Sequence, residues 1–197
     1  MLWSMLKGLR VQAPARAAGA ERRLHIGGQV RKEGWEVFNA LPGPAVDHLG
    51  DAQDLRRFAD GSFIEVYASH CLEHFDFREE VARALAEWHR VLAPGGRIYL
   101  SVPDLGALAR LILHPALTVD DRFTVVKMLF GAHRDAYDYH KAGFDFEILE
   151  HYLGEAGFID IQRVDQFGLF DDYSSLVSGG IPISLNVLAR RRGSAGS

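Results

Sequence analysis

From residue 24 onward the chain alternates short apolar runs with longer amphipathic stretches. Five apolar runs are bounded by Gly, Pro or Asp and predict strands: residues 24–26, 35–38, 45–49, 63–68 and 97–102. Two stretches, 78–92 and 145–156, place apolar side chains at helical spacing. This alternation is typical of βαβ units, so it predicts an α/β domain with a mostly parallel sheet and helices on both faces.

The remaining segments complete this picture. Residues 158–164 and 183–189 alternate as two final strands, which we expect to pair antiparallel at an edge of the sheet. Residues 105–140 form a largely helical insertion, a candidate lid. We expect about seven strands in a domain spanning residues 23–190, an N-terminal arm over 1–22 and a tail over 191–197. So few residues separate the first two strands that a loop is expected there instead of a helix.

Composition narrows the class of protein. A chain of 197 residues with 48% hydrophobic and 24% charged residues is typical of one globular domain. The net charge of -4 provides no basic stripe for nucleic acid, so a small-molecule acceptor is favoured over nucleic acid. Cys71 is the only cysteine, which excludes an intrachain disulfide and a multi-cysteine zinc site. A reducing compartment, the cytoplasm, is the expected location.

The N-terminal arm is the one segment for which membrane contact is considered. No apolar run is long enough to span a bilayer, so no membrane span is expected. Residues 1–23 are basic, which allows a weak membrane-surface contact or a transit peptide, but a frayed or packed arm is favoured. The sequence leaves the oligomeric state open.

Several segments occur in an order and at spacings that build one cleft. These are residues 24–27, 34–35 with Asn39, 46–51, 68–75, 88–96 and 101–104. Together they resemble the class I S-adenosylmethionine-dependent methyltransferases, in particular the methyltransferase type 11 group and its small bacterial branch. The resemblance implies a Rossmann-like class I methyltransferase fold and S-adenosyl-L-methionine as cofactor. It also implies an enzyme that transfers a methyl group to an oxygen or nitrogen of a small molecule or saccharide precursor.

The resemblance assigns the first cofactor contacts. Gly27 and Gly28 correspond to the loop that approaches the methionine carboxylate, because glycine lets backbone N–H groups come close. Gln29 stands where the family has a further glycine, and an ordinary strand-ending turn is the alternative. Asn39 occupies the position of the acid that binds the ribose hydroxyls, and its alternative is a turn residue.

The next cofactor contacts follow the third and fourth strands. Asp51 corresponds to the acid that accepts a hydrogen bond from the adenine amino group, and the backbone of Ala52 is then available to the ring. Ser69 follows the fourth strand and faces the cofactor cleft. The alternative for Asp51 is an exposed loop acid or a helix N-cap.

Two histidines are candidates for catalysis. His70 follows the fourth strand, near the expected methyl group, and imidazole is suited to remove a proton from an acceptor. A structural role for His70 is the alternative. His140, with Tyr139 and Arg134, ends the insertion and resembles a substrate-facing segment, for which a solvated loop is the alternative.

Two further interpretations come from departures from the family pattern and from a short histidine motif. Gln29 and Asn39 allow a degenerate methyltransferase-like domain that binds a metabolite or protein partner without catalysis. Residues 70–74 match the H-x-x-E-H pattern of some zinc peptidases. However, His70 directly follows a strand and no helix with a third ligand is evident. The sequence therefore predicts no metal site.

Overall fold

A seven-stranded sheet forms the centre of the computed structural model, which describes residues 21–193. The strand order is β3-β2-β1-β4-β5-β9-β6. The strands are β1 (Arg23–Ile26), β2 (Trp35–Asn39), β3 (His48–Leu49), β4 (Phe63–Ser69), β5 (Leu92–Pro103), β6 (Phe158–Val164) and β9 (Ser184–Arg191). The first five pair in parallel, and β9 lies antiparallel between β5 and β6. The predicted mostly parallel sheet with an antiparallel final pair is confirmed.

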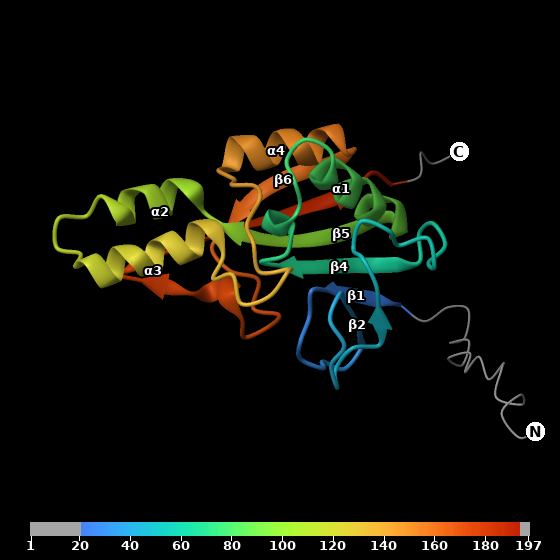
Figure 1. Cartoon of the computed structure of the whole chain (residues 1–197). Coiled ribbons are helices and arrows are strands. Elements are labelled where there is room, and N and C mark those ends of the chain that lie inside the picture. The colour runs from blue at the N-terminus through green and yellow to red at the C-terminus, as the bar shows by residue number, and fades with distance from the viewer. Residues whose placement is uncertain (1–20, 194–197) are drawn as a thin grey trace, which may run out of the picture.

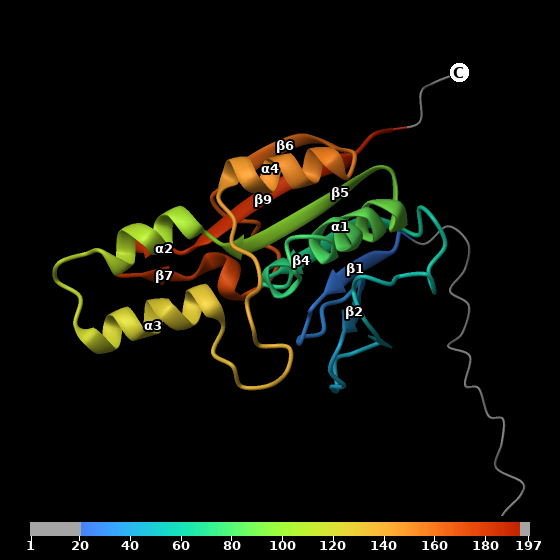
Figure 2. The ribbon, with the colours of Figure 1, turned by 45° about the horizontal axis from the view of Figure 1, so that its top comes forward.

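Two helices cover one face of this sheet, as Figures 1 and 2 show. They are α1 (Glu80–Val91) and α4 (Phe146–Glu155), close to their predicted ranges. Leu85 and Trp88 of α1 and Leu153 of α4 are fully buried in one core with the strands. The Trp88 indole N–H donates to the Ala52 carbonyl at 2.9 Å, which ties the loop after β3 to α1.

The opposite face carries an aromatic cap. His25 on β1 and Tyr67 on β4 pack against Phe170, which lies in the segment between β6 and β9. In the described residues no α-helix packs there; the single-turn 3-10 helix of residues 173–175 does, with the Tyr67 hydroxyl 3.3 Å from Ser174 Oγ. The expectation of α-helices on both faces is therefore wrong for this part of the chain. Only residues 27–34 link β1 to β2, and the next link, 40–47, is also a loop. Neither link is long enough for the usual crossover helix.

The insertion after β5 forms a second, smaller core. It contains α2 (Leu105–Ile112) and α3 (Val119–Phe130), and α3 begins with a capping box between Thr118 and Asp121. Leu108, Val125 and Ile183 are buried between these helices and the hairpin of β7 (Val177–Ser178) and β8 (Ile181–Pro182). Figure 1 shows both helices beyond the carboxyl ends of β4 and β5, where a lid is expected. Helical structure ends at Phe130, before the predicted limit of 140.

Two 3-10 helices complete the description: η1 (Leu72–His74) and η2 (Tyr173–Ser175). No helix of residues 21–193 is long and apolar enough to cross a membrane. Most of the predicted N-terminal arm and of the tail lies outside the described residues.

Candidate active site

The turn after β1 lies directly against the segment after β4. Gly27 has a φ of +76°, and its N–H donates to the Phe38 carbonyl at 2.8 Å. A Cβ on Gly27 would lie 3.4 Å from Cys71 Cβ, so the two segments leave little space between them. A Cβ on Gly28 would lie 2.7 Å from the His25 ring. The space that Gly28 leaves free is therefore occupied by a side chain of the protein itself.

Asn39 closes this turn with both ends of its amide. Its Nδ2 donates to the Gly28 carbonyl at 2.9 Å, and its Oδ1 accepts from the Leu41 N–H at 2.9 Å. These bonds match the alternative predicted for Asn39, a turn residue. They join the end of β2 to the glycine turn of β1.

Asp51 lies at the mouth of a cavity of about 460 Å³. Its Oδ1 accepts from the Gln53 N–H at 2.9 Å, and the side chain is exposed. Phe38 and Leu49 provide apolar walls to the same cavity. An apolar wall beside a free carboxylate oxygen fits the adenine ring and its amino group. Neighbouring Ala52 is buried, and Ser69 ends β4 opposite Ser101 of β5.

His70 is held in one tautomer by a chain of hydrogen bonds. It has a φ of +50°, a left-handed conformation that is uncommon outside glycine. Its Nε2 lies 2.9 Å from Ser184 Oγ, and that hydroxyl donates to the Tyr173 carbonyl at 2.7 Å. Because the hydroxyl proton is used, Nε2 must donate, and Nδ1 keeps its lone pair. Burial lowers the pKa of His70 to about 4, so the ring is neutral at pH 7.

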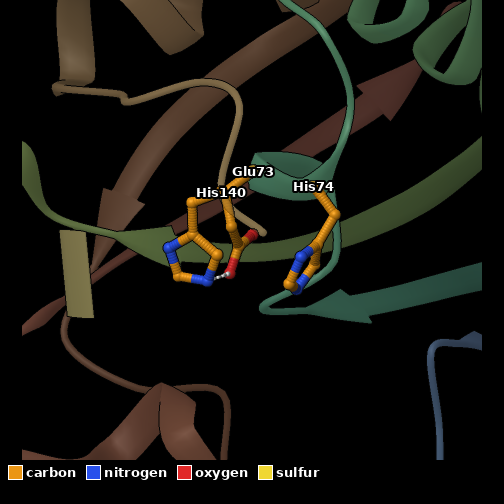
Figure 3. A group of neighbouring side chains, drawn as sticks. All are labelled: Glu73, His74 and His140. Atoms are coloured by element: carbon orange, nitrogen blue, oxygen red, sulfur yellow. Dashed lines mark ion pairs between the residues drawn. The ribbon is translucent and has the colours of Figure 1, made fainter. Parts of the chain in front are cut away.

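Glu73 is a buried carboxyl group without a hydrogen bond. It is 1% exposed, and neither side-chain oxygen has a hydrogen-bond partner in residues 21–193. Its Oε1 lies 3.5 Å from His70 Nδ1 and 3.9 Å from His140 Nε2, as Figure 3 shows for His140. Burial raises the pKa of Glu73 to about 8. These contacts therefore join uncharged groups at pH 7, and they are not ion pairs.

His74 and His140 complete the cluster from two different segments. Their rings meet edge to face with centroids 4.8 Å apart, and burial lowers the pKa of both, that of His140 to about 4. The N–H groups of Lys141 and Ala142 donate to the Glu73 carbonyl at 2.8 and 3.1 Å. These two backbone bonds fix the segment of His140 against η1.

The structure brings His70 and His140 to the same carboxyl, while the side chains of Arg134 and Tyr139, the other members of the predicted substrate segment, make contacts outside the cluster. Arg134 is exposed and pairs with Asp138 at 2.7 Å. Tyr139 stacks on His133 with ring centroids 4.0 Å apart. Sequence reasoning missed the role of Glu73. The only signal for it was the short motif of residues 70–74, which contains Glu73.

The zinc-peptidase arrangement is absent from residues 70–74, because η1 is a single turn and His70 belongs to the strand end. A metal site without that helical arrangement is still compatible with the fold. A third potential ligand, His140, comes from a loop and not from a helix.

Comparisons with known proteins show which family and which structures the chain is similar to. Residues 29–100 match the model of the methyltransferase domain family. A SAM-dependent methyltransferase from Archaeoglobus fulgidus is similar in structure, with 18% identity, a TM-score of 0.56, and coverage of 88% of this chain and 87% of that one. A SAM-dependent methyltransferase from Methanosarcina mazei has 17% identity and a TM-score of 0.52, and the alignment covers 90% of this chain and 95% of that one. No curated protein matches the sequence.

A third structure is longer than this chain. The CurJ carbon methyltransferase has 14% identity and a TM-score of 0.52, and the alignment covers 90% of this chain but only 50% of that one. The shared fold confirms the predicted class I methyltransferase fold. The domain match over residues 29–100 supports the predicted resemblance to the methyltransferase type 11 group. The matching domain family is one of methyltransferases, and the two archaeal structures are described as SAM-dependent.

The described residues fit the adenine end of S-adenosylmethionine better than its ribose. The cavity beside Asp51 suits adenine, and the turn at Gly27 follows the carboxyl end of β1, where open α/β sheets bind ligands. At the ribose position, Asn39 already uses its amide to hold Gly28 and Leu41.

Proposed function

We propose that the protein transfers the methyl group of S-adenosylmethionine to an oxygen or nitrogen of a small molecule or saccharide precursor. The contact between Gly27 and Cys71 supports this proposal. It sets the glycine turn of β1 beside the cluster that follows β4, at the carboxyl ends of parallel strands. Ligands of open α/β sheets bind at this edge.

In this proposal the cofactor lies along the ends of β1, β2 and β3. Asp51 accepts from the adenine amino group, with the backbone of Ala52 beside the ring. The turn of Gly27 and Gly28 approaches the methionine part, and Ser69 lines the cleft toward β4. Asn39 contributes by holding the turn through its bond to the Gly28 carbonyl. The bound cofactor supplies a methyl group on a sulfonium, an electrophile that needs no metal or general acid.

His70 is the proposed general base. An acceptor hydroxyl must lose its proton as the methyl group is transferred, and a neutral imidazole accepts that proton readily. The hydrogen bond from Nε2 to Ser184 leaves Nδ1 as the basic nitrogen. Ser184 orients the base, as the third group does in nucleophile and base pairs. His140, on the other side of Glu73, is the second candidate.

Binding and turnover measured separately test this proposal. Titration calorimetry with S-adenosylhomocysteine should give a dissociation constant in the micromolar to sub-millimolar range, about -8 to -4 kcal/mol. Asp51→Ala should weaken binding by about 1 to 3 kcal/mol. Transfer from labelled S-adenosylmethionine should then be assayed with hydroxyl- and amine-bearing sugars and small molecules. Absence of binding at millimolar ligand would contradict the proposal. We place this activity in the cytoplasm, in keeping with the single cysteine.

One observation favours a second candidate function. Asn39 and Gly28 are engaged with the protein itself, so the ribose position lacks a free acidic acceptor. A degenerate domain that binds a metabolite or protein partner without catalysis fits this arrangement. Binding of S-adenosylhomocysteine without turnover of any acceptor would favour this candidate.

A further inference from the structure

Three potential metal ligands converge at the carboxyl end of β4. Glu73, His74 and His140 each offer one ligand atom, and these atoms all lie within 4.8 Å of one another. Figure 3 shows the Glu73 carboxyl group between the two imidazole rings. Glu73 and His74 come from η1, and His140 comes from the loop that precedes α4.

The carboxyl group of Glu73 lacks the partners that a buried acid needs. Burying a carboxylate without hydrogen bonds or a counter-charge costs several kcal/mol, so such groups are normally paired, protonated or bound to a metal. In residues 21–193 both oxygens are buried and neither accepts a hydrogen bond. Oε1 faces the cluster, with His70 Nδ1 3.5 Å and His140 Nε2 3.9 Å away.

The histidines are oriented as metal-binding histidines usually are. His74 Nδ1 lies 3.2 Å from the Tyr139 carbonyl, and since that oxygen only accepts, Nδ1 carries the proton and Nε2 keeps its lone pair. A ring N–H donated to a backbone carbonyl fixes the tautomer of a metal ligand in this way. His140 directs its Nε2 to Glu73.

From this geometry we propose that Glu73, His74 and His140 bind one divalent transition-metal ion, zinc being the best match. Two imidazoles and one carboxylate with open positions form a known ligand set for zinc and for other first-row metals. Ligand atoms at about 2.0 to 2.1 Å from a tetrahedral ion lie roughly 3.3 Å apart. The separation of 3.9 Å between His140 Nε2 and Glu73 Oε1 requires a closure of about 0.6 Å to reach the tetrahedral spacing.

The remaining atoms close by rotation of side chains, since the backbone is already fixed. Lys141 and Ala142 hold the His140 segment to the Glu73 carbonyl. Gly131 lets the loop between α3 and His140 fold back on itself, because a Cβ at Gly131 would lie 2.2 Å from the Asp138 carbonyl oxygen. In the loaded protein His140 is a ligand, which leaves His70 as the base of the proposed reaction.

Titration of the whole chain with zinc tests the site. Protein stripped with a chelator and desalted is titrated with zinc chloride by calorimetry, and cobalt is added in parallel to record its visible absorption. We expect about one equivalent of zinc bound with a dissociation constant in the micromolar range or below. The variants His74→Gln and His140→Gln should each weaken binding by at least about tenfold, or 1.4 kcal/mol. His151→Gln, on the exposed side of α4, is the matched control and should bind as the parent does.

Glu73→Gln is the third variant, and it should weaken zinc binding while it keeps the shape of the side chain. Its metal-free melting temperature shows whether it folds, and zinc should raise that temperature in the parent much more than in the variants. Binding of much less than one equivalent at 100 µM zinc, or equal affinity in the parent and His140→Gln, would overturn the proposal. S-adenosylhomocysteine binding is measured on the same samples, so a failure of the metal site is distinguished from a failure of the proposed methyltransferase function.

Discussion

The turn after β1 and the cluster after β4 lie at the same end of the sheet, but the polar side chain of the turn is hydrogen-bonded within the chain and the buried carboxyl of the cluster is not. In the turn, the Asn39 amide is bonded to Gly28 and Leu41, and the space above Gly28 contains the His25 ring. In the cluster, the Glu73 carboxyl is buried between histidines and accepts no hydrogen bond.

This difference separates residues that support the fold from residues that are available to a ligand. A polar group whose bonds are all made within the chain contributes to stability and has little left to offer. A buried polar group without partners lowers stability unless something else binds it. We therefore expect changes in the turn to alter mainly the free energy of unfolding, and changes in the cluster to alter mainly turnover and ligand binding.

The largest effect is expected at His70. His70→Asn removes the proposed base but keeps a residue type that tolerates the left-handed φ of +50°. Loss of a general base typically lowers kcat by about 100-fold or more. Binding of S-adenosylhomocysteine should change less than about twofold, as Asn leaves the cofactor contacts intact. His133→Asn, at an exposed site with a φ of +56°, is the control and should retain full activity. Equal loss in both variants would refute the role of His70.

The next effect concerns stability as a function of pH. Burial lowers the pKa of His25 to about 4, below its ordinary 6.5. Between these values the unfolded chain takes up a proton that the folded chain does not, so stability falls as the pH is lowered through this window. The whole shift corresponds to about 3 kcal/mol, of which about 2 kcal/mol is lost between pH 7 and 4.5. Urea unfolding at pH 7 and 4.5, with chelator present, should show a smaller loss for His25→Leu than for the parent. The control His114→Leu, at an exposed site, should lose as much unfolding free energy between the two pH values as the parent does. An equal loss in His25→Leu and in the parent would contradict this account.

Much of the sheet is predictable because its signals are local. The apolar patterns of residues 63–68 and 158–164 predict the strands β4 and β6, and the helical spacing of Leu85 and Trp88 predicts α1. The aromatic cap is not predictable in the same way. Phe170 meets His25 from far along the chain, and no periodicity in either segment indicates that contact.

The candidate site was predictable only in part, for the same physical reason. Residue type is enough to indicate His70 and His140, but the contact of Glu73 with His140 depends on backbone bonds from Lys141 and Ala142, which are distant in sequence. Pattern alone places Glu73 next to inward-facing Leu72 and does not reveal which side of η1 is covered. The bonds of Asn39 likewise depend on how closely the turn of Gly28 approaches β2.

Gly28→Ala tests whether the turn is set by the protein's own packing. The new Cβ would lie 2.7 Å from the His25 ring, which is enclosed by Tyr67 and Phe170 with centroids 5.0 and 4.2 Å away. Overpacking of this kind costs about 1 to 3 kcal/mol, so chemical unfolding should show a less stable protein. Gly154→Ala in α4 meets nothing within 4 Å and should instead stabilise by up to about 1 kcal/mol. Unchanged stability in Gly28→Ala would show that the ring moves freely.

Asn39→Asp gives the smallest effect and separates the two interpretations of that residue by sign. Asp keeps an acceptor for the Leu41 N–H but loses the Nδ2 donor, and it brings a carboxylate oxygen toward the Gly28 carbonyl. Loss of that bond should lower the free energy of unfolding by about 1 kcal/mol. Because the loosened turn is part of the proposed cofactor site, S-adenosylhomocysteine should bind a few-fold more weakly. If Asn39 instead faced the ribose, the added charge would strengthen the hydrogen bonds to its hydroxyls, and affinity would rise. Asn39→Ala removes both bonds and should be less stable than Asn39→Asp. Calorimetry and urea unfolding of the three proteins at one pH and salt concentration decide between these outcomes, and tighter binding by Asn39→Asp would contradict the assignment of Asn39 to the turn.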